Sequence, residues 1–232
     1  MDLVYIVVGA TYLFSLLVMR RLKATYRRWG QVPNAAGATG AHGAVAILHA
    51  NGLDRVGVSP APGELSDHYD PRSKSIRLSE RVYRTPSVAS LAIAAHETGH
   101  AIQDAVDYRP LELRTTLAPI AQAGARFGMP ALLVGLVFGS PTLTQVGVLA
   151  YLGGLVFQVL TLPVEFNASR RALSQLEGLG LVRGEEKEGA RAVLKAAAMT
   201  YVAGVASSAG YMLYLVLIAG RWLFPRRESA SS

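Results

Sequence analysis

A chain of 232 residues without cysteine can form neither disulfides nor thiolate metal sites, so any metal must rest on His, Asp or Glu. Half of the residues (51%) are hydrophobic and only 17% are charged, which is more apolar than an ordinary soluble domain and favours a small domain joined to membrane spans. The net charge of +7 could indicate a nucleic-acid partner, but the basic residues gather beside apolar segments. That pattern is typical of a membrane protein, so we expect a lipid bilayer and no nucleic acid as partner.

The first apolar run extends from Leu3 to Met19 and is followed at once by Arg20, Arg21 and Lys23. A cleavable signal peptide has its positive charges before the apolar run and small residues after it, which is the reverse of this order. Residues 1–22 are therefore predicted to form an uncleaved first transmembrane helix, with the N-terminus outside and the basic flank in the cytosol.

Residues 23–111 are predicted to form a small cytosolic segment of mixed α and β structure. A short helix is expected over residues 44–50. Val56 to Ser59 alternates enough for a strand that Pro60 ends, and residues 74–78 alternate polar and apolar side chains as an edge strand does. The sequence thus predicts a strand pair, and an edge strand of this kind can hold an extended peptide by backbone pairing.

The central motif of the chain is the pair His96 and His100, which stand four residues apart. On a helix this spacing places both imidazoles on one face, one turn apart, where they can hold the same ion. Zinc is the usual occupant, and the intervening Glu97 can act as general base on a water and then as general acid toward a leaving amine. The alternative is a chance match on a core helix whose histidines are merely hydrogen-bonded.

The sequence around this motif favours a buried helix. Thr85 is a suitable N-cap, Pro86 suits the first helical position, and residues 88–95 are almost all apolar. Tyr108 to Pro110 ends the helix. Two histidines and a glutamate on a buried, uncharged helix need a partner that compensates their burial, which supports the metal interpretation.

The rest of the chain is predicted to be largely membrane-embedded, giving a mainly α integral membrane protein with about four transmembrane helices. Twenty of the 23 lysines and arginines lie between residues 20 and 126 or between residues 170 and 195, the stretches assigned to the cytosol and its flanks, which supports an N-terminus outside. The predicted segments are a transmembrane hairpin over 112–164, a third-ligand helix and an amphipathic cytosolic helix over 165–198, a last transmembrane helix over 199–224 and a disordered tail over 225–232.

A catalytic zinc needs a third protein ligand beyond the two histidines. Glu165 stands at the cytosolic end of the third predicted span, where a carboxylate is costly unless it is paired or bound to metal. The alternative is that Glu165 forms a salt bridge with Arg170 or Arg171.

Three other residues compete with Glu165 as ligands. His68 and Asp70 lie in a turn-rich stretch, where His68 is expected to make local hydrogen bonds or to touch substrate. Asp104 follows His100 by four residues, which places it near that histidine on the helix and makes it a candidate to support the ligand rather than to bind the ion.

Several motifs together resemble the YugP-type bacterial membrane zinc metallopeptidases, whose site is similar to that of the HtpX-like and CAAX-prenyl proteases. The resemblance covers nearly the whole chain. It rests on His96-Glu-Thr-Gly-His100-Ala-Ile-Gln, on Asp67-His-Tyr-Asp-Pro-Arg72 with Arg77-Leu-Ser79, and on Leu162-Pro-Val-Glu-Phe-Asn-Ala-Ser169.

The resemblance implies a gluzincin site, with one zinc ion on His96, His100 and Glu165 and with Glu97 as catalytic base. The HtpX-like group has an aspartate where this chain has Ser169, so a supporting role for that position is expected to be weaker here. Asn167, Arg170 and His68 stay open as candidates that stabilise the oxyanion.

The function expected from these observations is zinc-dependent endopeptidase activity at the cytosolic face of a bacterial inner membrane. The substrate would be an extended peptide segment of a membrane or misfolded protein, in a role in quality control that rests on family analogy. Two alternatives remain: a zinc-binding membrane scaffold or regulator without its own catalysis, and a transporter with a metal-binding gate. Too few spans argue against the transporter.

Overall fold

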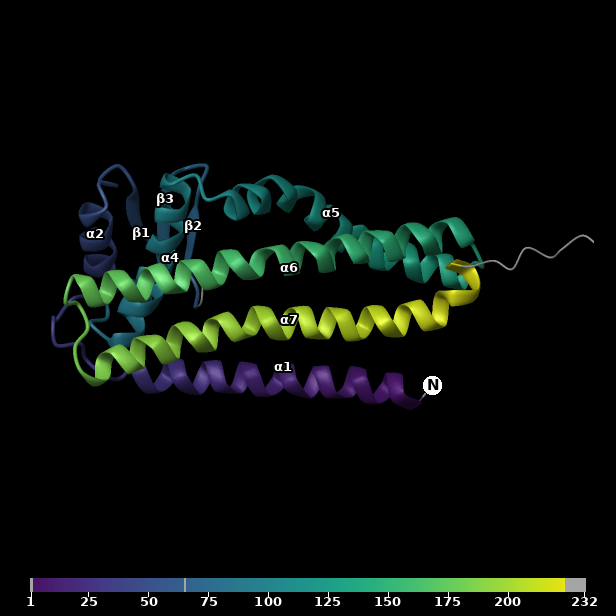
Figure 1. Ribbon diagram of the computed structural model, residues 1–232, viewed down its shortest axis with the longest axis horizontal. Coiled ribbons are helices and arrows are strands. Elements are labelled where there is room, and N and C mark those ends of the chain that lie inside the picture. Colours follow the sequence, from purple (N-terminus) through teal and green to yellow (C-terminus); the bar gives the residue numbers. More distant parts are fainter. Residues whose placement is uncertain (1, 65, 224–232) are drawn as a thin grey trace, which may run out of the picture. The chain divides into compact units, whose positions relative to one another are not determined.

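The computed structural model describes residues 2–64 and 66–223 (Figure 1). The tail that the sequence predicts to be disordered, 225–232, lies outside the described residues. The helices are α1 (Asp2–Trp29), α2 (Gly40–Ala50), α3 (Glu80–Arg84), α4 (Val88–Ala105), α5 (Arg109–Val137), α6 (Pro141–Gly178) and α7 (Glu185–Leu223), and the strands are β1 (Gly57–Ala61), β2 (His68–Asp70) and β3 (Ser75–Ser79).

Four of the described helices are long and apolar enough to cross a membrane. Large apolar side chains stand exposed on them, as lipid contact requires of a membrane-spanning surface; Phe138, just after α5, is 80% exposed and Leu3 of α1 is 72% exposed. The predicted fold class is thereby confirmed. The candidate spans are Leu3–Trp29, Arg109–Val137, Pro141–Gly178 and Glu185–Leu217.

The chain divides into two compact units, each of which is built from several separate segments. The first unit comprises residues 1–16, 114–160 and 202–232, and the second comprises residues 17–113 and 161–201. Because α6 runs through residue 164 without interruption, the boundary predicted between 164 and 165 lies inside a continuous helix.

Small residues allow the helices of the first unit to pack closely. In the hairpin of α5 and α6, a Cβ on Gly147 would stand 2.6 Å from Leu132 Cα, so only glycine permits this approach. Along α1 and α7, Ser15 Oγ and Ser207 Oγ share a hydrogen bond of 2.7 Å. Small residues of α6 and α7 thus serve helix packing.

The sheet of the second unit has three strands in the order β1-β3-β2, where the sequence predicted two. β3 is the central strand, parallel to β1 and antiparallel to β2, so the prediction that residues 74–78 form an edge strand is wrong. β2 was missed because it lies in a stretch rich in turn residues. Pro60 does not end β1 but lies within it. Proline has no backbone N–H to donate, and an edge strand such as β1 tolerates this because, among the described strands, it pairs on one side only.

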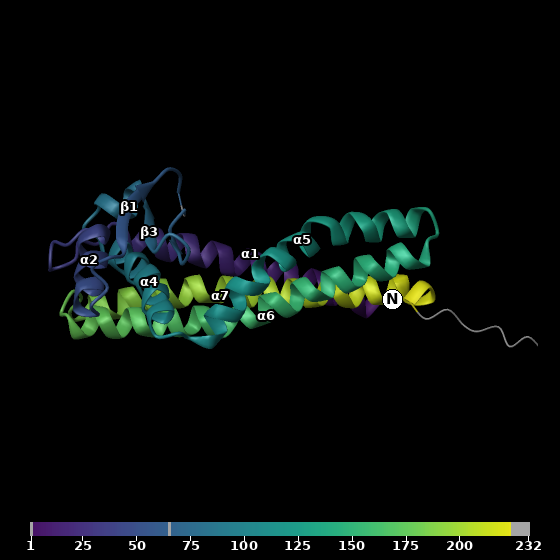
Figure 2. The same ribbon diagram turned by 90° about the horizontal axis from the view of Figure 1, so that it is seen from above.

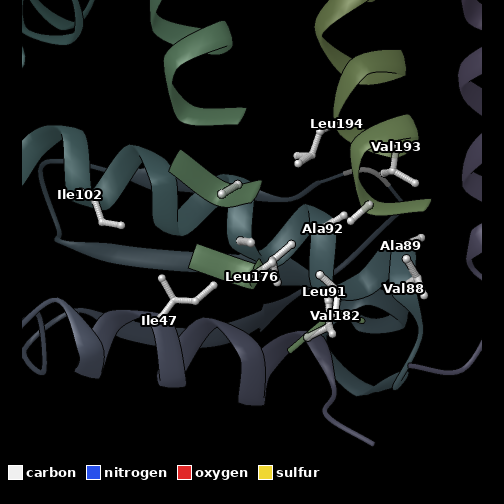
Figure 3. Close-up of a cluster of buried hydrophobic side chains, with 13 residues drawn as sticks. Ile47, Val88, Ala89, Leu91, Ala92, Ile102, Leu176, Val182, Val193 and Leu194 are labelled. Carbon is white, nitrogen blue, oxygen red and sulfur yellow. The ribbon is translucent and has the colours of Figure 1, made fainter. Parts of the chain in front are cut away.

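Helix α4 occupies the centre of the second unit. Ile76 and Leu78 of β3 pack with Ala94 and Ala101 on one side of it, and Figure 2 shows the sheet covering that side while α6 passes on the other. A second buried cluster joins α4 to α2, α6 and α7; in Figure 3, Ile47 and Leu176 point toward each other. The burial that the sequence predicts for the helix is confirmed.

The start of α4 differs from the prediction. Its N-cap is Ser87, whose Oγ accepts a hydrogen bond from the Ser90 N–H at 3.1 Å. Thr85 instead ends α3, and the carbonyl of Pro86 accepts a hydrogen bond from the Asn34 N–H at 3.1 Å. Since Thr85 is extended and the Pro86 carbonyl is bound by Asn34, the cap lies two residues further along the chain.

Gly99 brings α6 against α4. A Cβ at this position would stand 2.6 Å from the backbone oxygen of Ala168, so the two helices approach as closely as a glycine allows. This contact places residues 165–169 of α6 opposite the histidines of α4.

Gly99→Ala is expected to lower the free energy of unfolding by about 1–3 kcal/mol, because the added methyl meets backbone that cannot turn aside. It should also weaken zinc binding, because α6 must move away from α4. Thermal unfolding and zinc content measured in detergent test both effects. The matched control is Gly153→Ala on α6, where nothing lies within 4 Å of the added atom; equal behaviour of the two variants would contradict the role of Gly99.

Candidate metal centre

Two histidines of α4 and one glutamate of α6 meet in the interior of the second unit. The His96 and His100 rings lie edge to face, with centroids 4.8 Å apart and planes at 81°. Glu165 is only 1% exposed, and its Oε2 lies 3.1 Å from His96 Nε2 and 3.7 Å from His100 Nε2. The three residues that the sequence singled out are therefore brought together from two helices, with donor atoms within 4.8 Å of one another.

This donor set fits a zinc ion. Ligand atoms about 2.0–2.2 Å from a tetrahedral zinc lie about 3.3–3.6 Å from one another, and the two distances to Glu165 Oε2 bracket that range. Two imidazoles and one carboxylate are also the ligand types that leave a fourth position to water in catalytic zinc sites. His96, His100 and Glu165 could thus hold the ion.

Hydrogen bonds at the far ring nitrogens orient both imidazoles. His100 Nδ1 lies 3.0 Å from Gln103 Oε1, which can only accept, so Nδ1 carries the proton and the Nε2 lone pair faces Glu165. His96 Nδ1 lies 3.2 Å from Ser169 Oγ. Such contacts fix the tautomer and the ring angle of a ligating histidine.

Gln103 was not among the residues predicted from the sequence, and Ser169 was expected to have only a weak supporting role. Gln103 is fully buried, and its Nε2 donates to the Val164 carbonyl at 2.8 Å and to Asn167 Oδ1 at 3.0 Å. The signal available in the sequence was a glutamine three residues after His100, a spacing that places both side chains on the same face of a helix. Ser169 stands four residues after Glu165, which returns it to the same face of α6 despite its short side chain.

Glu97 lies beside His96 and is buried, with 8% of its surface exposed. Burial raises the pKa of the Glu97 carboxyl to about 7, and the nearby carboxylates of Glu165 and Asp67 act in the same direction. His96 and a hydrogen bond from the Tyr69 backbone N–H oppose this increase of the pKa. A carboxyl with a pKa near neutrality can both accept and return a proton.

The remaining candidates lie elsewhere. His68 is exposed in β2, where its Nδ1 lies 2.8 Å from the Ser66 carbonyl, so the expected local hydrogen bond is confirmed. Asp70 binds Ser73 Oγ and the Arg72 N–H within its own turn. None of these side chains belongs to the group that could hold a metal among the described residues.

Asp104 supports the edge of the sheet rather than His100. Its Oδ2 accepts a hydrogen bond from the Tyr69 hydroxyl and forms an ion pair with Lys74. These contacts connect the β2–β3 hairpin to α4. Burial, followed by this contact with Asp104, raises the pKa of Tyr69. Asp104 does lie one helical turn after His100, as the spacing predicts, but its side chain binds Tyr69 and Lys74 at the sheet.

Asn167 and Arg170 lie on α6 but differ in their relation to the histidines. Asn167 Oδ1 accepts from Gln103 Nε2 and from Arg171 Nε, at 3.0 and 2.8 Å, so it supports the residue that orients His100. Arg170 is exposed. The sequence left open a salt bridge between Arg171 and Glu165. In the structure, Arg171 Nε instead donates a hydrogen bond to Asn167.

The fold and this group of side chains define a membrane protein with a centre of the metallopeptidase type. A family model described as "Putative neutral zinc metallopeptidase" matches residues 4–220, and the chain belongs to this family, so zinc is its cofactor as predicted. The chain is 39% identical over 198 residues to the "Putative membrane protease YugP" of Bacillus subtilis (strain 168), a match that covers 85% of this chain and 88% of the relative. The resemblance found in the motifs is confirmed. No solved structure matches the chain.

Gln103→Ala is expected to weaken zinc binding by about 10- to 100-fold, because His100 loses the acceptor that fixes its tautomer. Competition with a chromogenic chelator measures the effect. Gln175→Ala is the matched control on α6, since it removes a hydrogen bond to Asn51 and touches neither histidine. Zinc affinities that are equal in the parent and in both variants would rule out an orienting role for Gln103.

Proposed function

We propose that this chain is a zinc-dependent endopeptidase in which His96, His100 and Glu165 hold the ion and Glu97 is the catalytic base. The observation that carries the proposal is the position of the Glu165 carboxylate, buried on α6 and 3.1 and 3.7 Å from the Nε2 atoms of the two α4 histidines. Membership in a family of zinc metallopeptidases supports the reaction class.

The chemistry divides between the ion and the chain. Zinc supplies, when bound, a Lewis acid that activates a water and polarises the scissile carbonyl. Glu97 takes the proton of that water and returns it to the leaving amine, for which its raised pKa is suited. Gln103 and Ser169 keep the imidazoles oriented, and the apolar packing of α4 excludes bulk water from their far side.

The substrate would bind as an extended peptide along β2. Among the described residues this short strand pairs with β3 on one side only, so a peptide could pair with the backbone groups of its other edge that Glu97 does not occupy. The Tyr69 N–H on β2 reaches Glu97, which brings this edge to the proposed base. Asp104, bound by Tyr69 and Lys74, would hold the strand in place.

The proposed setting is the cytosolic face of the bacterial inner membrane, with the N-terminus outside. The support is the distribution of lysine and arginine, of which only Arg221, Arg226 and Arg227 fall outside the stretches assigned to the cytosol. A site beside the bilayer suits membrane or misfolded proteins as substrates, and hence a role in quality control.

Glu97→Gln is expected to retain one zinc per chain and to lose cleavage of an unfolded protein by about 10²- to 10⁴-fold, because the amide cannot accept the proton. Zinc analysis and a peptide-release assay measure the two quantities. The control is Glu185→Gln, an exposed glutamate at the start of α7. Glu165→Gln should instead lose zinc, because a ligand is removed.

Cleavage by the Glu97→Gln variant at the parent's rate would refute the proposed base. If neither the parent nor the variant cleaves any substrate while both retain zinc, a metal-binding scaffold or regulator becomes the better description.

The absence of cysteine from the sequence makes the topology directly testable. With the N-terminus outside, Thr142→Cys at the start of α6 should react with a membrane-impermeant maleimide on intact cells. Ser73→Cys in the turn between β2 and β3 should react only after permeabilisation. Both positions are exposed, so the reverse pattern would place the site on the outer face.

A further inference from the structure

A polar pocket opens in the second unit, between α6, the end of α2 and Ile102 of α4. Its volume is about 370 Å³, which is within the range of small-molecule sites. Six polar side chains and one apolar residue line it: Asn51, Asn167, Arg170, Arg171, Ser174, Gln175 and Ile102.

The lining has a single sign of charge. Two arginines contribute positive charge, and none of the lining residues is acidic. Arg171 is held by a 2.8 Å hydrogen bond from its Nε to Asn167 Oδ1, so its guanidinium is already oriented before any ligand arrives. Asn51 at the end of α2 donates from its Nδ2 to Gln175 Oε1 of α6 at 2.9 Å, which fixes both amides.

This chemistry is suited to a phosphate group. Guanidinium groups bind phosphate oxygens through paired N–H donors, and a hydroxyl and amides nearby supply further donors. A carboxylate ligand would use fewer of these donors, and a cation would be repelled by both arginines.

The position along α6 indicates where such a phosphate could come from. The apolar run of α6 reaches Val164, and Arg170 follows six residues later. At a rise of 1.5 Å per residue this is about 9 Å, just past the polar headgroup layer, which is roughly 5–8 Å thick on one side of a bilayer. A phospholipid phosphate would therefore lie near the mouth of the pocket.

We propose that the pocket formed by Arg170, Arg171, Asn51, Asn167, Ser174 and Gln175 is a binding site for a phosphate group, carried by an anionic lipid or free in solution. The pocket shares Asn167 with the hydrogen bonds that orient His100, but it contains no proposed zinc ligand and not the proposed base. Its test does not use cleavage, so it stands or fails independently of the proposed peptidase activity.

The test is calorimetric titration of the zinc-loaded full chain in neutral detergent. The probes are inorganic phosphate, short-chain phosphatidic acid and the matching diacylglycerol, which lacks the phosphate. The Arg170→Gln, Arg171→Gln double variant should bind phosphate-bearing probes at least about tenfold more weakly than the parent, because two charge-assisted contacts are lost. The matched control is Arg20→Gln, Arg21→Gln, which removes the same charge from two exposed arginines of α1.

Ser174→Asp provides a second variant in which both arginines remain and a negative charge repels the phosphate. Binding of phosphatidic acid alone supports a lipid headgroup, and equal binding of inorganic phosphate supports a free anion. The proposal is overturned if no phosphate-bearing probe binds, if diacylglycerol binds as well as phosphatidic acid, or if both pocket variants retain the parent's affinity.

Discussion

The buried carboxylate of Glu165 imposes the main constraint on the second unit. A carboxylate that is 1% exposed costs several kcal/mol in free energy unless charged or hydrogen-bonding partners compensate its desolvation. The two imidazoles of α4 lie 3.1 and 3.7 Å away, and they can do so only because α6 approaches α4 at Gly99. The close packing of α4 and α6 is therefore what brings the imidazoles to the buried carboxylate. A cation bound by the three side chains would compensate the desolvation of Glu165 better than hydrogen bonds alone.

The same approach positions the supporting residues. Gln103 on α4 reaches across to the Val164 carbonyl and to Asn167, while Ser169 on α6 reaches back to His96. Each helix thus orients a side chain of the other. These hydrogen bonds fix the rotation of α4 relative to α6 about their axes. A site with this degree of mutual support is preorganised, which lowers the free-energy cost of assembling three ligands around one ion.

What the sequence could predict depends on the range of the interaction. The spacing of His96 and His100 and the long apolar runs are local patterns, and the structure contains the helices that they predict. Local turn propensity failed at β2, since β3 supplies the pairing that Asp70 and its neighbours would not favour alone. The helix start moved from Thr85 to Ser87 because distant backbone at Asn34 binds the Pro86 carbonyl. Gln103 and Asp104 show the same limit: helical spacing places both near His100, but only the partner element determines which one turns toward it.

Asp104 and Gln103 also explain how one helix serves two surfaces. Successive residues of α4 point about 100° apart, so Gln103 faces α6 while Asp104 faces the sheet. Through Tyr69, Asp104 fixes the strand whose backbone N–H reaches Glu97; through Gln103, the same turn fixes His100. The proposed base and one proposed ligand are consequently positioned by adjacent residues of a single helical turn. A shift of that turn would disturb the edge strand and the histidine together, which gives a physical reason for α4 to be the most deeply packed helix near the site.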